Sequence, residues 1–445
     1  MKLIKWSIMV AVFFCWVGSV HALVYHVSPT GNDNPPWPCG NEYNPCRTIG
    51  HVVSFAVNGD TIKVAEGFYW ENVRIDTSIS DLTIQGGWNG DFSARTEDPS
   101  VTVVFNKDTV NTNAVFSFNA GVWESISVTL EGLTIRGTLD MHRIGVYISS
   151  VGGQLDVSLL KNRIVNNTES GVSVYSGGGE EVSVVLHENQ IMWNQEPEGV
   201  PPSSGGGIYA ACFNSLSTIT LNLEKNVIAH NTANSGGGIY LFCSKGAMLQ
   251  AEMENNVIMN NKAINDHGGG IATSTGDTNS QLTVNLINNT ISQNTAGSSG
   301  GGIYVDSFFG ATNLVSIFNT IIWGNSANSS ENDIHIHAGT STVNASYSDI
   351  GDVSISGGGI YNPGPGNLNA DPSFDTDFHL LSRSPAIDKG QCGVKILNIY
   401  IRRAPYDDID GDLRPGFGKF WGCDIGADEY IVKAMPYIPF LLFDN

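Results

Sequence analysis

Apolar residues alternate with polar ones in a series of short segments through the middle of the chain. In one segment the apolar residues are Leu155, Val157 and Leu159, and the same spacing returns in later segments. A period of two predicts a β-strand with one buried face. No helical period of 3.6 residues extends over a comparable length, so the pattern predicts an all-β fold.

Two further signatures recur between these segments. The first is an Asn followed by an Ile two positions on and a second Asn five positions on, and it begins at Asn162, Asn189, Asn226, Asn256 and Asn289. The second is a Gly triplet, with spacings of 31, 32 and 32 residues, which occupies 205–207, 236–238, 268–270 and 300–302. Each repeat therefore combines short strands with Gly- and Asn-rich corners.

This repeat predicts a right-handed parallel β-helix. No single repeat has an apolar face broad enough to fold alone, and stacking places like residues of successive repeats in one core. A propeller blade would need four antiparallel strands and about 40 residues, and a leucine-rich horseshoe would need a helical return. Neither alternative fits the pattern.

The corner residues have a structural interpretation and a functional one. Asn tolerates left-handed backbone, and stacked Asn side chains can satisfy buried polar groups from coil to coil. The Gly runs suit tight corners that need positive φ. A ligand groove lined by Asn amides is the alternative that the sequence leaves open.

Charge and the N-terminal segment narrow the classes of function. The 445 residues include 22 Lys and Arg against 43 Asp and Glu, a formal charge of −21. An acidic surface argues against nucleic acid as a partner, because phosphate binding needs a basic face. Lys2 and Lys5 precede an apolar stretch from Ile8 to Val20, which predicts a signal peptide over residues 1–22 and an exported chain. No later stretch reaches the roughly 20 apolar residues of a transmembrane helix.

Six cysteines remain after this leader, and an even number in an exported chain predicts disulfides. They are Cys39, Cys46, Cys212, Cys243, Cys392 and Cys423. The repeat places Cys212 and Cys243 at the same position in adjacent coils, at a separation that a disulfide tolerates. We predict a bond between these two, with two buried thiols as the alternative.

The segment from Val24 to Tyr69 resembles the N-terminal coil of many secreted β-helix proteins. The resemblance is carried by Tyr25-His26-Val27-Ser28-Pro29, by a short loop from Cys39 to Cys46, and by Gly59-Asp60-Thr61-Ile62. It implies a cap that covers the open end of the solenoid, with a brief helix near residues 48–57. It also implies that Cys39 and Cys46 close their loop.

Five motifs near the C-terminus resemble, in their order, a choice-of-anchor Q domain, which follows β-helix repeats in bacterial surface proteins. They begin at Asp371, Phe378, Ser384, Asp408 and Asp424. The Gly-Gly-Ile runs and the Asn residues before them also resemble the repeats of polymorphic outer membrane proteins. The expected organisation is a signal peptide (1–22), a cap with the first coil (23–70), β-helix repeats (71–365), a choice-of-anchor Q-like module (366–430) and a tail (431–445).

Catalytic chemistry is sparse in the sequence, and we assign no catalytic residue. A glycosidase needs two carboxylates, and the only adjacent aspartate pair is Asp407-Asp408, in the terminal module. A lyase needs a Lys or Arg base, for which the nearest group is His142, Arg143, Lys161 and Arg163. Solubilising charge is the more ordinary interpretation of that group.

Metal binding has one candidate site. Asp408, Asp410 and Asp412 could hold Ca²⁺, although Asp-Gly turn chemistry explains the same residues. His335 and His337 alternate on one strand face without further ligands at metal spacing. No other cofactor is expected.

One face of the predicted solenoid carries aromatic residues. If the Ile residues after the Gly triplets point inward, then Tyr147, Tyr209, Tyr240 and Tyr304 point outward, with breaks at Ser173 and Ala272. Such rings can stack on sugars or contact a protein, or can simply pack across coils. We therefore expect a secreted or cell-surface scaffold, outer-membrane association being an alternative. It would bind extracellular polysaccharide or a surface protein, and the competing hypothesis is a polysaccharide lyase or glycoside hydrolase.

Overall fold

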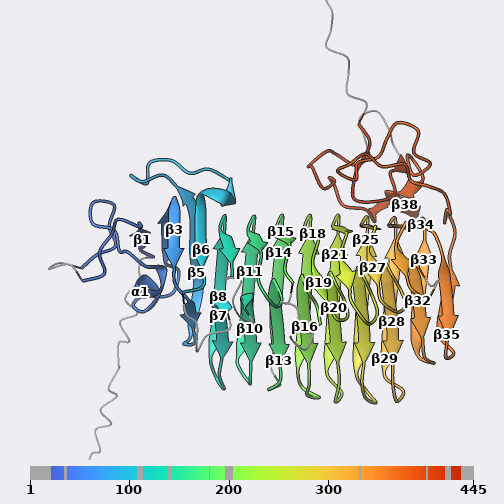
Figure 1. The fold of residues 1–445 in the computed structure, drawn as a ribbon, viewed down its shortest axis with the longest axis horizontal. Coiled ribbons are helices and arrows are strands. Elements are labelled where there is room, and N and C mark those ends of the chain that lie inside the picture. Colours follow the sequence, from blue (N-terminus) through green and yellow to red (C-terminus); the bar gives the residue numbers. More distant parts are fainter. Residues whose placement is uncertain are drawn as a thin grey trace, which may run out of the picture.

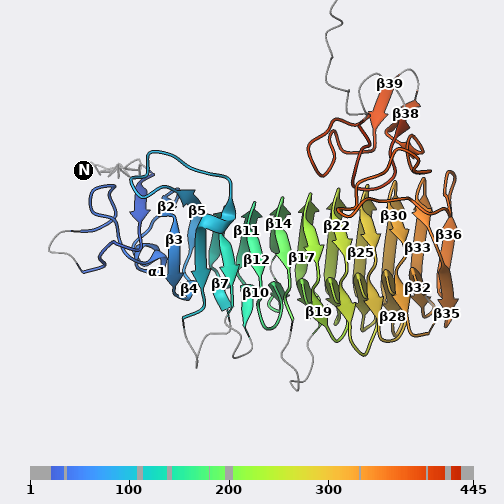
Figure 2. The ribbon, with the colours of Figure 1, turned by 45° about the horizontal axis from the view of Figure 1, so that its top comes forward.

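The computed structural model describes residues 22–34, 38–107, 114–137, 143–179, 181–195, 204–329, 332–396, 399–415 and 422–431. The chain forms a right-handed parallel β-helix that carries a small module on one flank of its C-terminal coils (Figures 1 and 2). The predicted signal peptide and tail fall almost entirely outside the described residues. Among the described residues, no helix is long and apolar enough to cross a membrane.

Each coil passes through three main parallel sheets, which we number in the order in which a coil visits them. Sheet 1 contains, in spatial order, β1 (Val24–Val27), β2 (Thr61–Ala65), β5 (Ile79–Trp88), β8 (Ser125–Glu131), β11 (Gln154–Leu160), β14 (Glu181–His187), β17 (Thr218–Glu224), β21 (Met248–Glu254), β25 (Gln281–Ile287), β29 (Thr312–Phe318), β33 (Ser341–Ser346) and β36 (Ile360–Pro363).

Sheet 2 is made of shorter strands that follow the first corner. Its strands are β3 (Gly67–Trp70), β6 (Thr102–Phe105), β9 (Thr134–Arg136), β12 (Arg163–Val165), β15 (Gln190–Met192), β18 (Val227–Ala229), β22 (Val257–Met259), β26 (Thr290–Ser292), β30 (Ile321–Trp323) and β34 (Asp349–Ile350).

Sheet 3 completes the coil. Its strands are β4 (Val73–Ile75), β7 (Ala114–Ala120), β10 (Ile144–Ser150), β13 (Val172–Ser176), β16 (Ile208–Cys212), β20 (Ile239–Cys243), β24 (Ile271–Thr275), β28 (Ile303–Ser307), β32 (Ile334–His337) and β35 (Val353–Ser356). Between sheets 2 and 3 a minor sheet joins β19 (Thr232–Ala233), β23 (Lys262–Ala263), β27 (Thr295–Ala296) and β31 (Ser326–Ala327).

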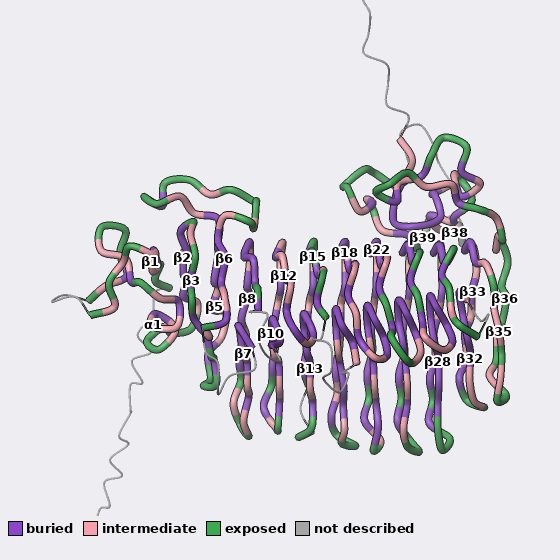
Figure 3. The backbone as a smooth tube through the Cα atoms, viewed as in Figure 1, coloured by how far each residue is buried: buried purple, intermediate pink, exposed green. Residues whose placement is uncertain are grey.

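The core is one continuous column of inward side chains. The backbone tube in Figure 3 is coloured as buried at positions along the length of the solenoid. Leu155, Val157 and Leu159 on β11 are at most 1% exposed, while the residues between them are partly exposed. They pair in register with β14 on one side and β8 on the other. The period-two prediction of strands with one buried face is confirmed.

The recurrent Asn residues form two buried columns. In the second column Asn231, for example, donates from its backbone N and from its Nδ2 to Oδ1 of Asn261, each at 3.0 Å. Its Nδ2 also donates to the carbonyl of Ile191, at 2.8 Å, in the preceding coil. Both hydrogen-bonding ends of the amide are therefore used inside the protein, which supports the structural interpretation over the amide-lined groove.

The left-handed backbone lies one residue before each column residue, which differs from our expectation for the Asn residues themselves. Lys161 and Asn255, for example, have φ of 53° and 54°, and each precedes a column Asn. At the Gly triplets only the first Gly has positive φ, 72° at Gly205. The third is required by close packing, because a Cβ on Gly207 would lie 2.6 Å from the carbonyl oxygen of Gly238.

The N-terminal coil is covered by a cap. Helix α1 (Ile49–Val53) is shorter than predicted, and the Thr48 side chain accepts a hydrogen bond from the backbone N of His51. Glu71 accepts from the backbone N of Ile49 at 2.9 Å. A disulfide joins Cys39 to Cys46, as the resemblance implied.

The C-terminal module packs on the corner between sheets 1 and 2 and on the outer face of sheet 2. It contains two antiparallel pairs, β37 (Gly390–Gln391) with β40 (Gly422–Cys423) and β38 (Gly393–Ile396) with β39 (Ile399–Arg402). A second disulfide, between Cys392 and Cys423, joins two of its segments. Asn255, Asn288 and Asn319, all left-handed corner residues, donate hydrogen bonds to backbone carbonyls of the module. The module is thus anchored to several successive coils.

Candidate ligand-binding face

Four tyrosine rings follow one another in contact on the outer face of sheet 3. The ring centroids lie 5.5 Å apart between Tyr147 and Tyr175, 5.2 Å between Tyr175 and Tyr209, and 5.8 Å between Tyr209 and Tyr240. All four are half-buried. We call Tyr147, Tyr175, Tyr209 and Tyr240 the tyrosine ladder. Tyr175 bridges the break expected at Ser173, because it lies two residues further along the same outward face.

Only the two end rings lack a neighbouring ring of the ladder on one side. Inside the ladder Tyr209 and Tyr240 are parallel, with an interplanar angle of 2°, whereas Tyr175 is tilted by 45° to Tyr147 and by 43° to Tyr209. Tyr147 pairs in register with Ser117 on its other side, and Tyr240 pairs with Ala272. Neither neighbour has a ring, so each end of the ladder borders a hollow.

Tyr304, the remaining predicted surface tyrosine, contributes little surface. It is 8% exposed, and its ring stacks on His267 with centroids 4.0 Å apart and on His335 with centroids 5.6 Å apart. His267 comes from the corner before β24 and occupies part of the space that a ring at Ala272 would fill. The break at Ala272 is therefore real, while the one at Ser173 is bridged.

The first hollow lies beside Tyr147 and has a volume of about 450 Å³. Besides Tyr147 and Tyr175, its polar lining includes Arg74, Asn119 and Glu169. Arg74 forms an exposed ion pair with Asp76 at 2.8 Å. Opposite charges thus line a site of the size that small ligands occupy.

The second hollow lies between Tyr240 and Tyr304 and has a volume of about 410 Å³. It is lined by two carboxylates, two imidazoles and a tyrosine hydroxyl, from Asp266, Asp306, His267, His337 and Tyr240. The Nε2 of His267 lies 3.0 Å from Oδ1 of Asp266. No Lys or Arg is among the described residues that line it.

Burial raises the pKa values of two side chains that line the second hollow, Asp306 and Tyr240. Asp306 is 4% exposed, and burial raises its pKa against the opposing effect of His337. Its Oδ1 accepts no hydrogen bond from any described residue. Burial, and next the charge of Asp266, raise the pKa of Tyr240 to about 12, so that its hydroxyl keeps its proton at neutral pH.

The basic group considered for a lyase is not assembled on this face. Lys161 lies at the corner between β11 and β12, where its Nζ is 3.1 Å from Glu97 and 3.6 Å from Glu188. Arg163 follows in β12 of sheet 2, whereas Arg143 is buried just before β10 of sheet 3. His142 lies outside the described residues.

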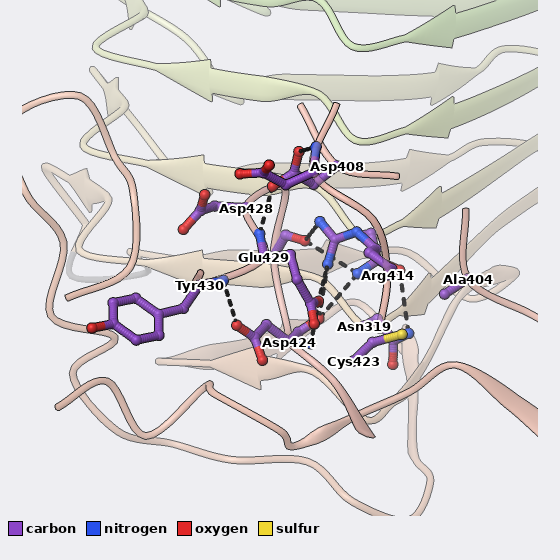
Figure 4. A network of polar contacts seen from close by, with 12 residues as sticks. Asn319, Ala404, Asp408, Arg414, Cys423, Asp424, Asp428, Glu429 and Tyr430 are labelled. Carbon is purple, nitrogen blue, oxygen red and sulfur yellow. Dashed lines mark hydrogen bonds and ion pairs between the residues drawn. The ribbon is translucent and has the colours of Figure 1, made fainter. Parts of the chain in front are cut away.

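The aspartates predicted to bind calcium have other partners in the structure. Asp408 is fully buried, and its carboxylate accepts hydrogen bonds from the backbone N of Asp410, Asp412 and Glu429 at 2.8–2.9 Å (Figure 4). This arrangement agrees with the Asp-turn alternative, and calcium binding by Asp408, Asp410 and Asp412 stays a prediction. The neighbouring Asp407 pairs with the buried Lys225 at 2.7 Å.

The motifs of the terminal module meet in one polar network (Figure 4). Arg414 is fully buried, with its Nη1 3.2 Å from Oε2 of Glu429. Asp424 accepts from the backbone N of Asp388 and of Tyr430, each at 2.7 Å. The order of these motifs therefore has a structural explanation, and membership of the choice-of-anchor Q family stays a prediction.

A different acidic group lies at the surface of this module. Ligand atoms of His379, Asp410 and Asp428 lie within 4.8 Å of one another, in a hollow of about 610 Å³. Asp428 also accepts a hydrogen bond from the backbone N of Leu380 at 2.7 Å. These residues are a second candidate group for calcium at the module, beside the predicted Asp408, Asp410 and Asp412.

Cys212 and Cys243 lie in register on β16 and β20, as predicted. Both are buried thiols in the structure, with the two sulfur atoms 2.9 Å apart. The structure thus has the arrangement that we stated as the alternative, two buried thiols. A bond between the two sulfurs stays a prediction.

Sequence reasoning missed four residues of this face. Tyr175 and Asp306 follow Ser173 and Tyr304 by two positions, so the same period that selected the tyrosines could have found them. Asp266 and His267 precede a Gly triplet and carry no periodic signal. Only the fold brings them beside Asp306 and His337, which lie in adjacent strands.

Comparison with known proteins supports the fold more than an activity. Residues 290–306 match the model of the Chlamydia polymorphic membrane protein repeat. This match agrees with the resemblance of the repeats and covers β26, β27 and part of β28. No curated protein matches the sequence.

Solved structures with the same architecture include a pectate lyase. Pectate lyase Pel9A is 14% identical, and the alignment covers 93% of this chain and 98% of that one with a TM-score of 0.55. XylC in complex with xylose is 10% identical over 92% of this chain and 98% of that one, with a TM-score of 0.46. The first similarity shows a shared parallel β-helix, and the second is too low to carry an argument.

Proposed function

We propose that this protein is an extracellular or cell-surface scaffold that binds a neutral polysaccharide along the outer face of sheet 3. One observation carries the proposal: the tyrosine ladder ends in a hollow on each side, and its end rings, Tyr147 and Tyr240, each face a hollow without a neighbouring ring. An uncovered aromatic face is a suitable platform for a sugar ring.

The spacing suits a chain rather than a single sugar. From β7, which lines the first hollow, to β28, beyond the second hollow, there are six steps between neighbouring strands. At about 4.8 Å a step this is about 29 Å. A linear glycan that crossed this distance would contact both hollows and the tyrosine rings between them.

Charge favours a neutral glycan over a polyuronate. The chain has a formal charge of −21, and the second hollow is lined by Asp266 and Asp306 with no Lys or Arg among its described residues. An acidic polymer would be repelled by this field. The pectate lyase with the same fold is named for an acidic substrate, whereas among the described lining residues of the two hollows Arg74 is the single basic side chain besides histidine, and it is paired with Asp76.

Binding to immobilised polysaccharides tests the proposal. We expect the exported chain to bind at least one neutral polymer, such as xylan, mannan or β-glucan, more tightly than polygalacturonate. Tyr147→Ala and Tyr240→Ala should each weaken binding about tenfold, the equivalent of 1.4 kcal/mol. Tyr406→Ala is the matched control, because this tyrosine is 75% exposed in the terminal module. Equal binding by all variants, or binding to none of the polymers, would refute the proposal.

A further inference from the structure

The second hollow contains more ionisable side chains than sugar binding requires, namely two carboxyl groups and two imidazoles. Asp306 lies between Ser274 of β24 and His337 of β32, and it is almost completely buried. Burying a carboxyl whose Oδ1 lacks a hydrogen-bond donor destabilises a protein, and such groups are concentrated at functional sites. Neither Ala272 nor Ser274 of β24 carries a ring, and this interruption of the aromatic series leaves the hollow that Asp306 lines.

The two carboxylates of the hollow have different surroundings. Asp266 has a side chain that is 43% exposed and is held by His267 at 3.0 Å. Asp306 is buried, and its environment favours the protonated carboxyl. One solvated carboxylate and one buried carboxyl facing the same ligand space is the arrangement in which one group can act as a base and the other as an acid.

We infer that the second hollow hydrolyses a glycosidic bond of the polysaccharide bound along sheet 3, with Asp306 as general acid and Asp266 as general base. This inference rests on the proposed function. Asp306 gives its proton to the glycosidic oxygen as the bond from that oxygen to the anomeric carbon breaks. Asp266 takes a proton from a water molecule whose oxygen forms the new bond to the anomeric carbon. The products are a free hydroxyl and a new reducing end.

Elimination chemistry is disfavoured at the same place. A lyase abstracts a proton next to a uronate carboxyl, and it needs a strong base together with a cation that stabilises the developing charge. The described lining has no Lys or Arg, and no three of its described carboxylates and imidazoles bring ligand atoms within 4.8 Å of one another. The hollow therefore fits hydrolysis of a neutral glycan.

The remaining polar groups of the hollow have positioning roles. His337 accompanies Asp306 in register, and its Nδ1 lies 2.7 Å from Oγ of Ser356. Tyr240 keeps a protonated hydroxyl, which can donate a hydrogen bond to a sugar oxygen. Activity should fall as the pH rises and Asp306 loses its proton, with His267, His337, Tyr240, Tyr304 and Asp266 as the groups that face it.

The test is release of reducing ends from the neutral polymers that the exported protein binds. Asp306→Asn and Asp266→Asn should each lower kcat about 10²-fold to 10⁴-fold, with polymer binding retained. Asp277→Asn, an exposed aspartate in the loop after β24, is the control and should keep full activity. Thermal unfolding of each variant verifies that it is folded.

Two further results separate the inference from the proposed function. Ala272→Tyr should complete the ladder, fill the hollow and abolish turnover, while Asp277→Asn outside the hollow keeps it. Binding without new reducing ends, or full activity of both aspartate variants, overturns the inference and leaves the binding function standing. Absence of binding to every polymer overturns both.

Discussion

The asparagine columns and the tyrosine ladder are both stacks of like side chains, yet they respond differently to interruption. Where the first column lacks Asn, Thr320 and Ser348 take its place and accept from the backbone N of Asn289 and Thr320. Where the ladder lacks a ring, at Ala272, nothing replaces it except part of His267. A buried amide must be matched, whereas a gap on the surface can be filled by solvent or ligand.

This difference indicates where function can be placed in a solenoid. The buried polar residues repeat from coil to coil because each coil provides the hydrogen-bond partners of the next coil. The residue type at each buried position is therefore constrained by the matching residues in the two adjacent coils. The outer face has no such requirement, and a departure from the repeat there creates a hollow at low cost. The ends and gaps of outer ladders are therefore better places to search for chemistry than the ladders themselves.

The largest expected effect comes from a break in a buried column. Asn261→Leu removes the acceptor of both Asn231 donors and the donor to Ile228 and Asn294. We expect a loss of about 3–5 kcal/mol in the free energy of unfolding, because several buried groups become unsatisfied. Urea denaturation measures the loss.

Asn265→Ala in the same coil is the control for that experiment. Its Nδ2 donates to Asn234 at the exposed surface. A change within about 0.5 kcal/mol is expected at such a position. Equal effects of the two substitutions would show that the column has no special role in stability.

The next effect tests the pair of cysteines inside strands β16 and β20, which also carry Tyr209 and Tyr240 on their outer face. We predict that Cys212 and Cys243 are bonded after export. The bond would close a loop of 31 residues, for which chain entropy gives about 3–4 kcal/mol. Mass spectrometry of unreduced peptides detects the link, and Cys212→Ser with Cys243→Ser measures the stability. Complete alkylation of both thiols without reductant would contradict the prediction.

A smaller effect on stability is expected at Asp349, whose carboxyl is covered by the segment that contains Leu368 and Ala370. Burial, followed by the charges of Asp371 and Asp333, raises the pKa of Asp349 to about 6. A raised carboxyl pKa contributes stability that is complete below the unfolded pKa and is lost as the pH rises through about 6.

Asp349→Asn should therefore gain stability relative to the wild type as the pH rises from 4 to 7.5, by about 2 kcal/mol. Asn can still accept from the backbone N of Ala370, as Oδ1 of Asp349 does at 3.0 Å. Denaturation of both proteins at the two pH values measures the difference. A constant difference would show that Asp349 titrates normally in the folded protein.

The smallest expected effect comes from the ladder itself. Tyr209→Ala removes stacking with Tyr175 and Tyr240 and leaves solvent in the space. A loss of about 1 kcal/mol in unfolding free energy is expected for cross-strand aromatic contacts on a half-exposed face. A loss as large as that of Asn261→Leu would remove the distinction between the two kinds of stack.

Much of the architecture could be predicted because it depends on repeated local rules. The alternation around Leu155 has the period of a strand, and the structure contains the corresponding parallel sheets. The recurrence of Asn and Gly has the period of one coil, and the Asn residues form columns in the structure. The register of Cys212 with Cys243 follows from the same period. The motifs of the terminal module predicted a choice-of-anchor Q-like domain, which stays a prediction. The ion pair of Arg414 with Glu429 was not predicted, because these two residues belong to different motifs without a shared spacing.

The sequence by itself determined the coil, its corners and the face on which aromatic residues lie, since each depends on spacings within one repeat or between neighbouring repeats. Three contacts were decided only by the tertiary structure. The ring of His267 covers Tyr304, and the Asp408 carboxylate accepts backbone hydrogen bonds. Asp266 and Asp306 line the same hollow. These contacts join residues without a shared period, so burial and side-chain direction, rather than spacing, determine which groups remain available to a ligand.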